Sequence, residues 1–275
     1  MTRAWPRRFL RWGRRGKNQL IEFQALRRCD AFIISPPKAG RTWLRVLLWK
    51  YLSDTYGVED RDLDLMRFTS QLPGAPVMAM SHDGSSLREA RTAAQLDDDK
   101  RRYQRAKVVF LARDPRDLLV SLYYQATHRR GHFAGDISAF LRDPRFGVDK
   151  MIRFMNIWEA NRTAPREFLL VRYEDMRADP ARELERMLLF LGVPVDAERV
   201  REAVAFADFP NMRRLEREGY FASTMMRAKD ATDEASFKTR KGQVGGYREE
   251  LSPEDVAYLE ERVARDLAPA FGYTG

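Results

Sequence analysis

The stretch Ala31-Phe-Ile-Ile-Ser35-Pro-Pro-Lys-Ala-Gly-Arg-Thr-Trp43 decides the fold. Its first five residues form a short apolar run typical of a buried strand, and the two prolines end that run. From Thr42 to Ser53, apolar residues recur with helical spacing, which predicts a helix with one face turned to a core. A buried strand that leads through a tight turn into such a helix is typical of a parallel α/β sheet.

The same alternation continues along the chain. The expected strands are 77–81, 107–112 and 168–171. Four further helices are expected. One starts at Arg116, a second includes Met151–Trp158, a third runs from Asp179-Pro180 to Gly192, and the last starts at the capping box Ser252-Pro-Glu-Asp255.

This order predicts an α/β domain over residues 29–275, with a single, mainly parallel, doubly wound sheet flanked by helices. Ligands of such sheets bind beyond the carboxyl ends of the strands. The loops to inspect for chemistry therefore follow Ser35, Ser81, Ala112 and Arg172.

The composition excludes several classes of protein. The 275 residues are 44% hydrophobic and 32% charged, which does not fit a disordered chain, a collagen-like fibre or a polytopic membrane protein. A single cysteine, Cys29, excludes an intrachain disulfide framework and a zinc site with several thiolates. One free thiol favours a reducing compartment, so we expect a cytoplasmic protein.

The net charge of +9 resides almost entirely in residues 1–28, which carry nine basic side chains and one acid, Glu22. We treat this segment as a basic N-terminal arm, separate from the domain. The arm is either a solvated terminus, which we favour, or a surface for peripheral contact with an anionic membrane or with nucleic acid. We expect no specific nucleic acid as a partner, and the sequence leaves the oligomeric state open.

The loop after the first strand combines Lys38, Gly40 and Thr42 at the start of a helix. The first turn of a helix presents main-chain N–H groups that suit a cluster of anionic oxygens. The lysine precedes the glycine, so the loop is not the GxxxxGK[ST] motif of nucleoside-triphosphate kinases. Taken alone, the loop fits phosphate binding and a tight structural turn equally well.

The loop after the third strand reads Arg113-Asp-Pro-Arg-Asp-Leu-Leu-Val-Ser121-Leu-Tyr-Tyr124. Arg113 offers a planar fork of donors for phosphate oxygens, and Ser121 adds a hydroxyl. Alternatively, Arg113 belongs to a structural ion pair, and Asp117 complements the helix dipole.

Together the two loops resemble the cytosolic-type sulfotransferases, which use 3′-phosphoadenosine 5′-phosphosulfate (PAPS) and release 3′-phosphoadenosine 5′-phosphate (PAP). Residues 37–43 are similar to the family motif P-K-S-G-T-T-W, and residues 113–124 are similar to R-[ND]-P-[KR]-D-x-x-V-S-x-[YF]-[YF]. The family's R-K-G element is similar to Arg240-Lys241-Gly242. The resemblance implies a P-loop-like nucleotide-kinase fold and a PAPS-dependent sulfotransferase without a metal.

The resemblance also implies roles for individual residues. The donor-binding residues would be Pro37, Lys38, Ala39, Gly40, Arg41, Thr42 and Trp43 around the 5′ phosphosulfate, Arg113, Ser121, Arg240, Lys241 and Gly242 at the 3′-phosphate, and Trp43, Tyr173 and Phe209 at the adenine. Two departures stand out, since Ala39 replaces the serine of the motif and Arg41 replaces its first threonine.

His82 follows the second strand, where the family has its catalytic histidine, and is the predicted general base. A neutral imidazole, with an unperturbed pKa of about 6.5, can take a proton from an acceptor hydroxyl. Lys38 is predicted to stabilise the leaving phosphate. The alternatives are a P-loop phosphotransferase and a non-catalytic basic protein that binds nucleotide or membrane.

The acceptor, a small molecule or a glycan, is not specified by the sequence. We expect mobile loops at 125–150 and 213–240 to surround it, and the aromatic residues within them either line its pocket or belong to the core. These aromatic residues are Phe133, Phe140, Phe146, Tyr220 and Phe221. His128 and His132 are expected at the surface.

Overall fold

The computed structural model describes residues 25–129, 131–222, 226 and 242–274. Four strands form one sheet, β1 (Ala31–Ile34), β2 (Met78–Ser81), β3 (Lys107–Ala112) and β4 (Glu167–Arg172). All pairings are parallel, and the strand order is β2-β1-β3-β4. The predicted parallel α/β sheet is confirmed, and each predicted strand agrees with an observed one to within one residue at either end.

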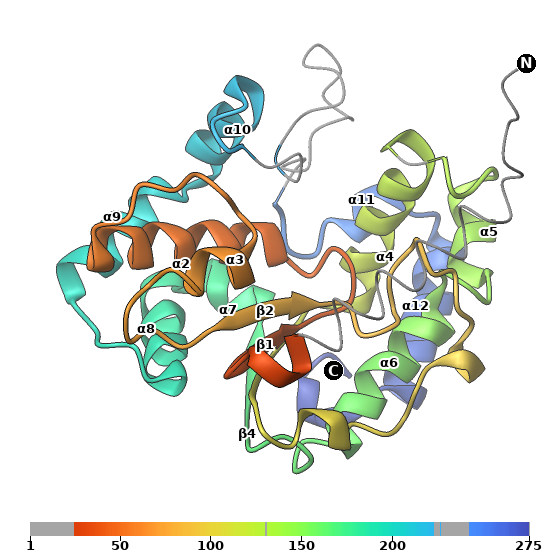
Figure 1. Ribbon diagram of the computed structural model, residues 1–275. Coiled ribbons are helices and arrows are strands. Elements are labelled where there is room, and N and C mark those ends of the chain that lie inside the picture. The colour runs from red at the N-terminus through yellow and green to blue at the C-terminus, as the bar shows by residue number, and fades with distance from the viewer. Residues whose placement is uncertain (1–24, 130, 223–225, 227–241, 275) are drawn as a thin grey trace, which may run out of the picture.

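Helices cover both faces of the sheet. They are α2 (Arg41–Tyr56), α3 (Leu65–Thr69), α4 (Pro115–Tyr124), α5 (Ile137–Arg142), α6 (Val148–Ala160), α7 (Tyr173–Ala178), α8 (Pro180–Leu191), α9 (Ala197–Phe206), α10 (Phe209–Glu218), α11 (Tyr247–Glu250) and α12 (Pro253–Asp266). Helices α2, α3, α8 and α9 gather on one side of the sheet, and α4, α6 and α12 gather on the other (Figure 1).

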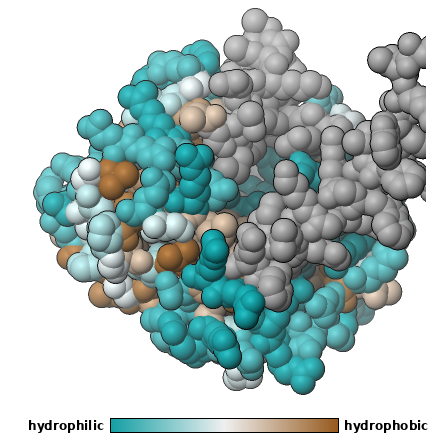
Figure 2. All heavy atoms as spheres, viewed as in Figure 1, coloured by the Kyte–Doolittle hydropathy of each residue, from teal (hydrophilic) through white to brown (hydrophobic). Residues whose placement is uncertain are grey.

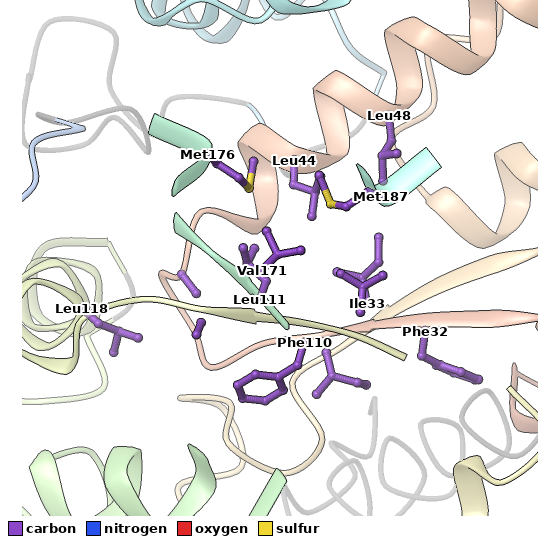
Figure 3. Packing of buried hydrophobic residues seen from close by; sticks show 14 of the residues in the cluster. Phe32, Ile33, Leu44, Leu48, Phe110, Leu111, Leu118, Val171, Met176 and Met187 are labelled. Atoms are coloured by element: carbon purple, nitrogen blue, oxygen red, sulfur yellow. The ribbon is translucent and has the colours of Figure 1, made fainter. Parts of the chain in front are cut away.

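Consecutive strand residues point to opposite faces of the sheet, as the pleat requires. Ile33, Leu111 and Val171 point toward Leu44 and Leu48 of α2 and toward Met176 and Met187 of α7 and α8 (Figure 3). On the opposite face, Phe110 lies 5.9 Å from both Phe154 and Trp158 of α6, measured between ring centroids. Both faces are buried, which explains why the strands read as continuous apolar runs.

The strand order creates a switch point. From β1 the chain passes through α2 and α3 to β2 on one side, and then returns to β3 on the other side of β1. In an open parallel sheet, a crevice for ligands lies at the point where the connections diverge, outside the carboxyl ends of the strands. Here that point lies between Ser35 and Arg113, at the ends of β1 and β3.

Several boundaries differ from the sequence expectation. Helix α2 continues to Tyr56, because the left-handed Gly57 ends it rather than Ser53. The predicted capping box of α12 is only half formed. Ser252 Oγ accepts the Asp255 N–H at 3.2 Å, whereas the Asp255 carboxylate accepts hydrogen bonds from Ser138 and Arg142 of α5.

The segment 125–150 is wrongly predicted as a loop. It contains a π-helical turn at Gln125–Arg129, then α5 and the start of α6. Phe140 and Phe146 lie in the core with parallel rings 5.8 Å apart, and Phe221 packs edge-on against Trp49 at 5.0 Å. Core packing, the alternative stated for these three rings, is therefore the observed one.

Candidate active site

The turn after β1 adopts a backbone that few side chains tolerate. Lys38 has φ +70° and Gly40 has φ +93°, and Gly40 is the N-cap residue of α2. Aspartate side chains cap α3, α4, α5, α8, α9 and α10, whereas α2 starts on a glycine that has no side chain to do so. The first N–H groups of α2 thus remain available for an anion.

Gly40 is required by packing as well as by its backbone angle. A Cβ atom at this position would lie 2.5 Å from Cδ2 of Tyr173, the first residue of α7. Gly242 has φ +62°, and a Cβ there would lie 2.9 Å from the ring of Phe209. Both glycines therefore let the main chain approach an aromatic ring at the same cavity.

Arg113 links three segments of the chain. Its Nη1 donates to the Lys38 carbonyl at 3.1 Å, and its Nη2 donates to the Gln243 carbonyl at 3.3 Å. The guanidinium also lies 4.4 Å from the centroid of the Tyr173 ring. Arg113 is buried, and these contacts fix its guanidinium between the turn after β1 and the segment after Gly242.

Asp117, four residues after Arg113 and in α4, contacts that same segment. Its carboxylate accepts the N–H of Gly245 at 2.7 Å and the N–H of Tyr247 at 3.0 Å. Burial raises the pKa of Asp117, and the two main-chain hydrogen bonds and the charge of Arg113 oppose this rise. The sequence suggested, as one alternative, that Asp117 only complements the helix dipole. In the structure, its main contacts are instead the two main-chain N–H groups of Gly245 and Tyr247.

His82 directly follows β2 and is half-buried. Its Nδ1 lies 2.9 Å from the carbonyl oxygen of Ser35, at the end of the neighbouring strand β1. A carbonyl can only accept, so Nδ1 carries the proton in the neutral ring and Nε2 carries the lone pair. This is the tautomer that a general base acting through Nε2 needs.

One cavity of about 500 Å³ collects these residues. The predicted site residues that line it are Pro37, Lys38, Gly40, Arg41, Thr42, Trp43, His82, Arg113, Ser121, Tyr173, Phe209 and Gly242. Ala39 is fully buried and is not part of the lining. Arg240 and Lys241 lie outside the described residues. His132 is exposed, as expected, and it also lines the cavity.

The lining also contains residues that sequence reasoning missed. Arg45 follows Arg41 by one helical turn, and Arg177 lies 5.7 Å from the Trp43 ring. Met212 and Glu216 face the cavity from α10. The i,i+4 spacing from Arg41 was a usable signal for Arg45, whereas α10 was not predicted as a helix, so nothing in the sequence pointed to its inner face.

Arg41, the first residue of α2, places a buried guanidinium at the start of that helix. Arg41 has a buried Nη1 without a hydrogen-bond partner among the described residues. Burial, and then the charge of Arg45, lower the pKa of Arg41. A cation whose charge is disfavoured in this way gains stability when an anion binds beside it.

Within the described residues, no three His, Cys, Asp or Glu side chains are arranged to hold a metal ion, and the expectation of a metal-free site stays a prediction. None of the helices in this part of the chain has the length and apolar character needed to cross a bilayer. In Figure 2, the coloured part of the surface is mainly hydrophilic, with hydrophobic residues scattered over it.

Comparison with known proteins relates this site to one family. The sulfotransferase domain matches residues 28–269. Cytosolic sulfotransferase 12 of Arabidopsis thaliana is 25% identical over 267 residues, covering 90% of this chain and 78% of that protein. Sulfotransferase 4A1 of Mus musculus is 27% identical over 206 residues, 69% of each chain.

A solved structure has the same fold. The crystal structure of mouse sulfotransferase SULT7A1 complexed with PAP superposes with a TM-score of 0.59 at 19% identity, covering 87% of this chain and 84% of that one. The match over residues 28–269 rejects the alternative of a P-loop phosphotransferase. The chain belongs to the sulfotransferase family, and the predicted class of enzyme, a PAPS-dependent sulfotransferase, is thereby confirmed.

Proposed function

We propose that this protein transfers the sulfuryl group of PAPS to a hydroxyl or amine of a small-molecule or glycan acceptor, with His82 as the base and Lys38 as the stabiliser of the leaving phosphate. One observation carries the proposal. Lys38, His82 and Arg113 follow three adjacent parallel strands, and all three line the same cavity. A cation, the proposed base and the proposed phosphate-binding arginine thus come from the loops at one edge of the sheet, and this arrangement supports in-line transfer.

The residues of the first turn fit the phosphosulfate end of the donor. The main-chain N–H groups at the start of α2, the Lys38 ammonium and the hydroxyl of Thr42 would hold its anionic oxygens. Pro37 and the buried Ala39, whose side chains are apolar, would shape the turn around the donor. The guanidinium of Arg41, whose Nη1 has no hydrogen-bond partner among the described residues, would supply the charge that compensates for the two missing hydroxyls of the motif.

The other end of the donor is assigned to a second group of residues. Arg113 and Ser121 would bind the 3′-phosphate together with Gly242, and Arg240 and Lys241 are proposed for the same role from the motif alone. Trp43 and Phe209 would flank the adenine, and Tyr173 would contact it. The Trp43 and Tyr173 rings meet edge to face with centroids 6.0 Å apart, and the Trp43 Nε1 donates to the Ala207 carbonyl, so this aromatic wall is fixed.

The chemistry follows from the orientation of these groups. Bound PAPS supplies an electrophilic sulfur whose leaving group is the 5′-phosphate. His82 would take the proton of the acceptor hydroxyl at Nε2, while its Nδ1–H remains on the Ser35 carbonyl. The Lys38 ammonium would neutralise the charge that grows on the bridging oxygen.

The proposal is tested by ligand binding and then by turnover. PAP should raise the melting temperature of the full chain, and ATP at the same concentration should not. Labelled PAPS should then transfer sulfate to at least one member of a panel of phenols, alcohols, amines and sugars. Equal stabilisation by ATP and PAP, or PAP binding without any transfer, would contradict the assignment.

The basic arm lies mostly outside the described residues, so its contact with a membrane stays a prediction. The cytoplasmic location of the protein also stays a prediction.

A further inference from the structure

Asp83, the residue after His82, carries a buried carboxylate that contacts several side chains. It has φ +45°, a left-handed conformation that aspartate tolerates better than most side chains, and it is buried. This conformation turns the chain at the end of β2. His82 then lines the cavity, while the carboxylate of Asp83 lies in the protein interior.

Four side chains donate to this carboxylate. Lys100 Nζ lies 2.7 Å from Oδ2, and Trp158 Nε1 of α6 donates to the same oxygen at 3.0 Å. Arg102 pairs with Oδ1, and the Tyr103 hydroxyl donates to Oδ1 at 3.0 Å. Lys100 is buried and also donates to the Asp97 carbonyl at 2.5 Å, so the charge pair is enclosed and hydrogen-bonded on both sides.

The main chain around His82 is fixed from the same point. The Asp83 N–H donates to Ser81 Oγ at 2.9 Å, and the His82 carbonyl accepts the N–H of Ser85 at 2.8 Å and its hydroxyl at 2.6 Å. On the other side of the turn, the His82 ring contacts the Ser35 carbonyl. The ring is therefore held between the end of β1 and the turn that Asp83 anchors.

We propose that Asp83 is a positioning residue for His82, and that the donors from 100–103 and α6 hold the base in the Nδ1–H tautomer at the cavity. This inference rests on the proposed function of His82. Asp83 does not contact the cavity itself, so it acts only through the angle at which the turn presents the imidazole. A small rotation of the imidazole ring would lengthen the 2.9 Å contact between His82 Nδ1 and the Ser35 carbonyl. The ring would then no longer be restricted to the Nδ1–H tautomer that this contact selects.

The test is Asp83→Asn in the full chain, read by nitrogen NMR of the imidazole rings in the PAP-loaded protein. The chain has only three histidines, so His82→Asn identifies the His82 signals by their loss. We expect the neutral His82 of Asp83→Asn to change from one tautomer to a mixture. With the best acceptor of the panel, kcat should fall about tenfold while the Kd for PAP stays within about twofold, the effect expected when one charged hydrogen-bond contact is weakened.

Asp83→Asn leaves the buried Lys100 beside a neutral amide, and this variant could fail to fold for that reason. A milder variant keeps the test decisive in that case. Tyr103→Phe removes one hydrogen bond to Asp83 and keeps the ring packed against Phe32 and Trp158. Tyr51→Phe is its control, because it also removes a buried hydroxyl contact, to the Pro194 carbonyl and the Asp196 N–H, but away from the site. Tyr103→Phe should move the His82 signals and lower kcat, and Tyr51→Phe should lower only the melting temperature.

Unchanged His82 signals and unchanged kcat in folded Asp83→Asn, or in Tyr103→Phe where only that variant folds, would overturn the inference. Failure of the proposed function has a different signature. The unsubstituted protein would then not bind PAP or not transfer sulfate. The His82 spectrum of each variant, recorded without PAP if PAP does not bind, would still report whether Asp83 sets the orientation of the ring.

Discussion

The guanidinium of Arg113 donates a 3.1 Å hydrogen bond to the main-chain carbonyl of Lys38. These residues are 75 positions apart, at the ends of the adjacent strands β3 and β1. The residue proposed for the 3′-phosphate therefore also supports the turn proposed for the phosphosulfate. A substitution at Arg113 should affect both ends of the donor, but unequally.

We expect Arg113→Ala to weaken PAP binding by about 10²-fold or more, because a buried charged donor pair for a phosphate is lost. Adenosine 5′-phosphate lacks the 3′-phosphate, so its affinity should fall much less, through the loss of support to Lys38 alone. Calorimetric titration of both ligands into both proteins measures the difference. Equal losses for the two ligands would exclude Arg113 as the 3′-phosphate residue.

Gly40→Ala should abolish detectable PAP binding and lower the free energy of unfolding by about 2 kcal/mol or more. The new methyl would lie 2.5 Å from Tyr173 and adopt φ +93°, so strain and a steric clash add. Gly57→Ala at the other end of α2 is the control. It also has a positive φ, +67°, but its Cβ would meet nothing within 4 Å.

Gly57→Ala should therefore cost about 1 kcal/mol and leave the Kd for PAP unchanged. Denaturant unfolding and a PAP titration on both variants provide the measurement. Normal PAP affinity in Gly40→Ala would contradict the close approach of the turn to the aromatic wall.

His82→Asn should lower kcat by about 10²-fold or more at an unchanged Kd for PAP, because a base is removed and the donor contacts remain. His128→Asn is the control, since His128 is exposed and stacks on Tyr124 with ring centroids 5.7 Å apart. Steady-state kinetics with the best acceptor provide the measurement. Full turnover in His82→Asn would remove the histidine from the mechanism.

Lys38→Met should also lower kcat by about 10²-fold, because the leaving phosphate loses its point charge. In contrast to His82→Asn, it should weaken donor binding as well, since in the proposed site the ammonium would contact anionic oxygens before and during transfer. The ratio of the two effects, from PAPS kinetics and PAP titration, separates the roles. A Lys38→Met protein with normal kcat would show that the charge is not used.

Lys150 of α6 offers a test at high pH. It is fully buried, its Nζ has no hydrogen-bond partner among the described residues, and burial lowers its pKa to about 8. Between this value and the higher pKa of an unfolded lysine, the unfolded chain binds more protons than the native protein. The contribution of Lys150 to stability therefore rises with pH across that window, and its penalty is complete below about pH 8.

We expect Lys150→Met to raise the free energy of unfolding by about 2 kcal/mol at pH 7, and the advantage should shrink toward pH 10. Lys50→Met is the control, because Lys50 is partly exposed and pairs with Asp54 at 2.9 Å within α2. That variant should change stability by less than about 0.5 kcal/mol at either pH. A pH-independent effect of Lys150→Met would show that its charge carries no penalty.

The sheet and the two motif loops could be predicted because their signals are local. Lys107–Ala112 is apolar along almost its whole length, since helices cover both of its faces, and the turn after β1 carries its lysine and glycine within five residues. Helix ends were less predictable. The left-handed Gly57, not Ser53, ends α2, and three further residues continue its helix.

Contacts between distant residues could not be predicted. The carboxylate of Asp83 meets Trp158 across 75 positions, and that of Asp117 meets the Tyr247 N–H across 130. Composition alone also does not tell which side of an element an aromatic residue occupies, so Phe140 and Phe146 were candidates for an acceptor pocket until packing placed them in the core. Burial decides such cases, and burial depends on the whole fold.

Trp43 gives the molecule a built-in optical reporter. The other tryptophans are Trp5 and Trp12 in the basic arm, and Trp49 and Trp158, which are buried in the core. Of the three tryptophans that the structure describes, Trp43 is the one that lines the cavity, between Tyr173 and the Arg177 guanidinium. Its emission should respond when a nucleotide base stacks there, so occupancy of the pocket can be followed in real time without any label.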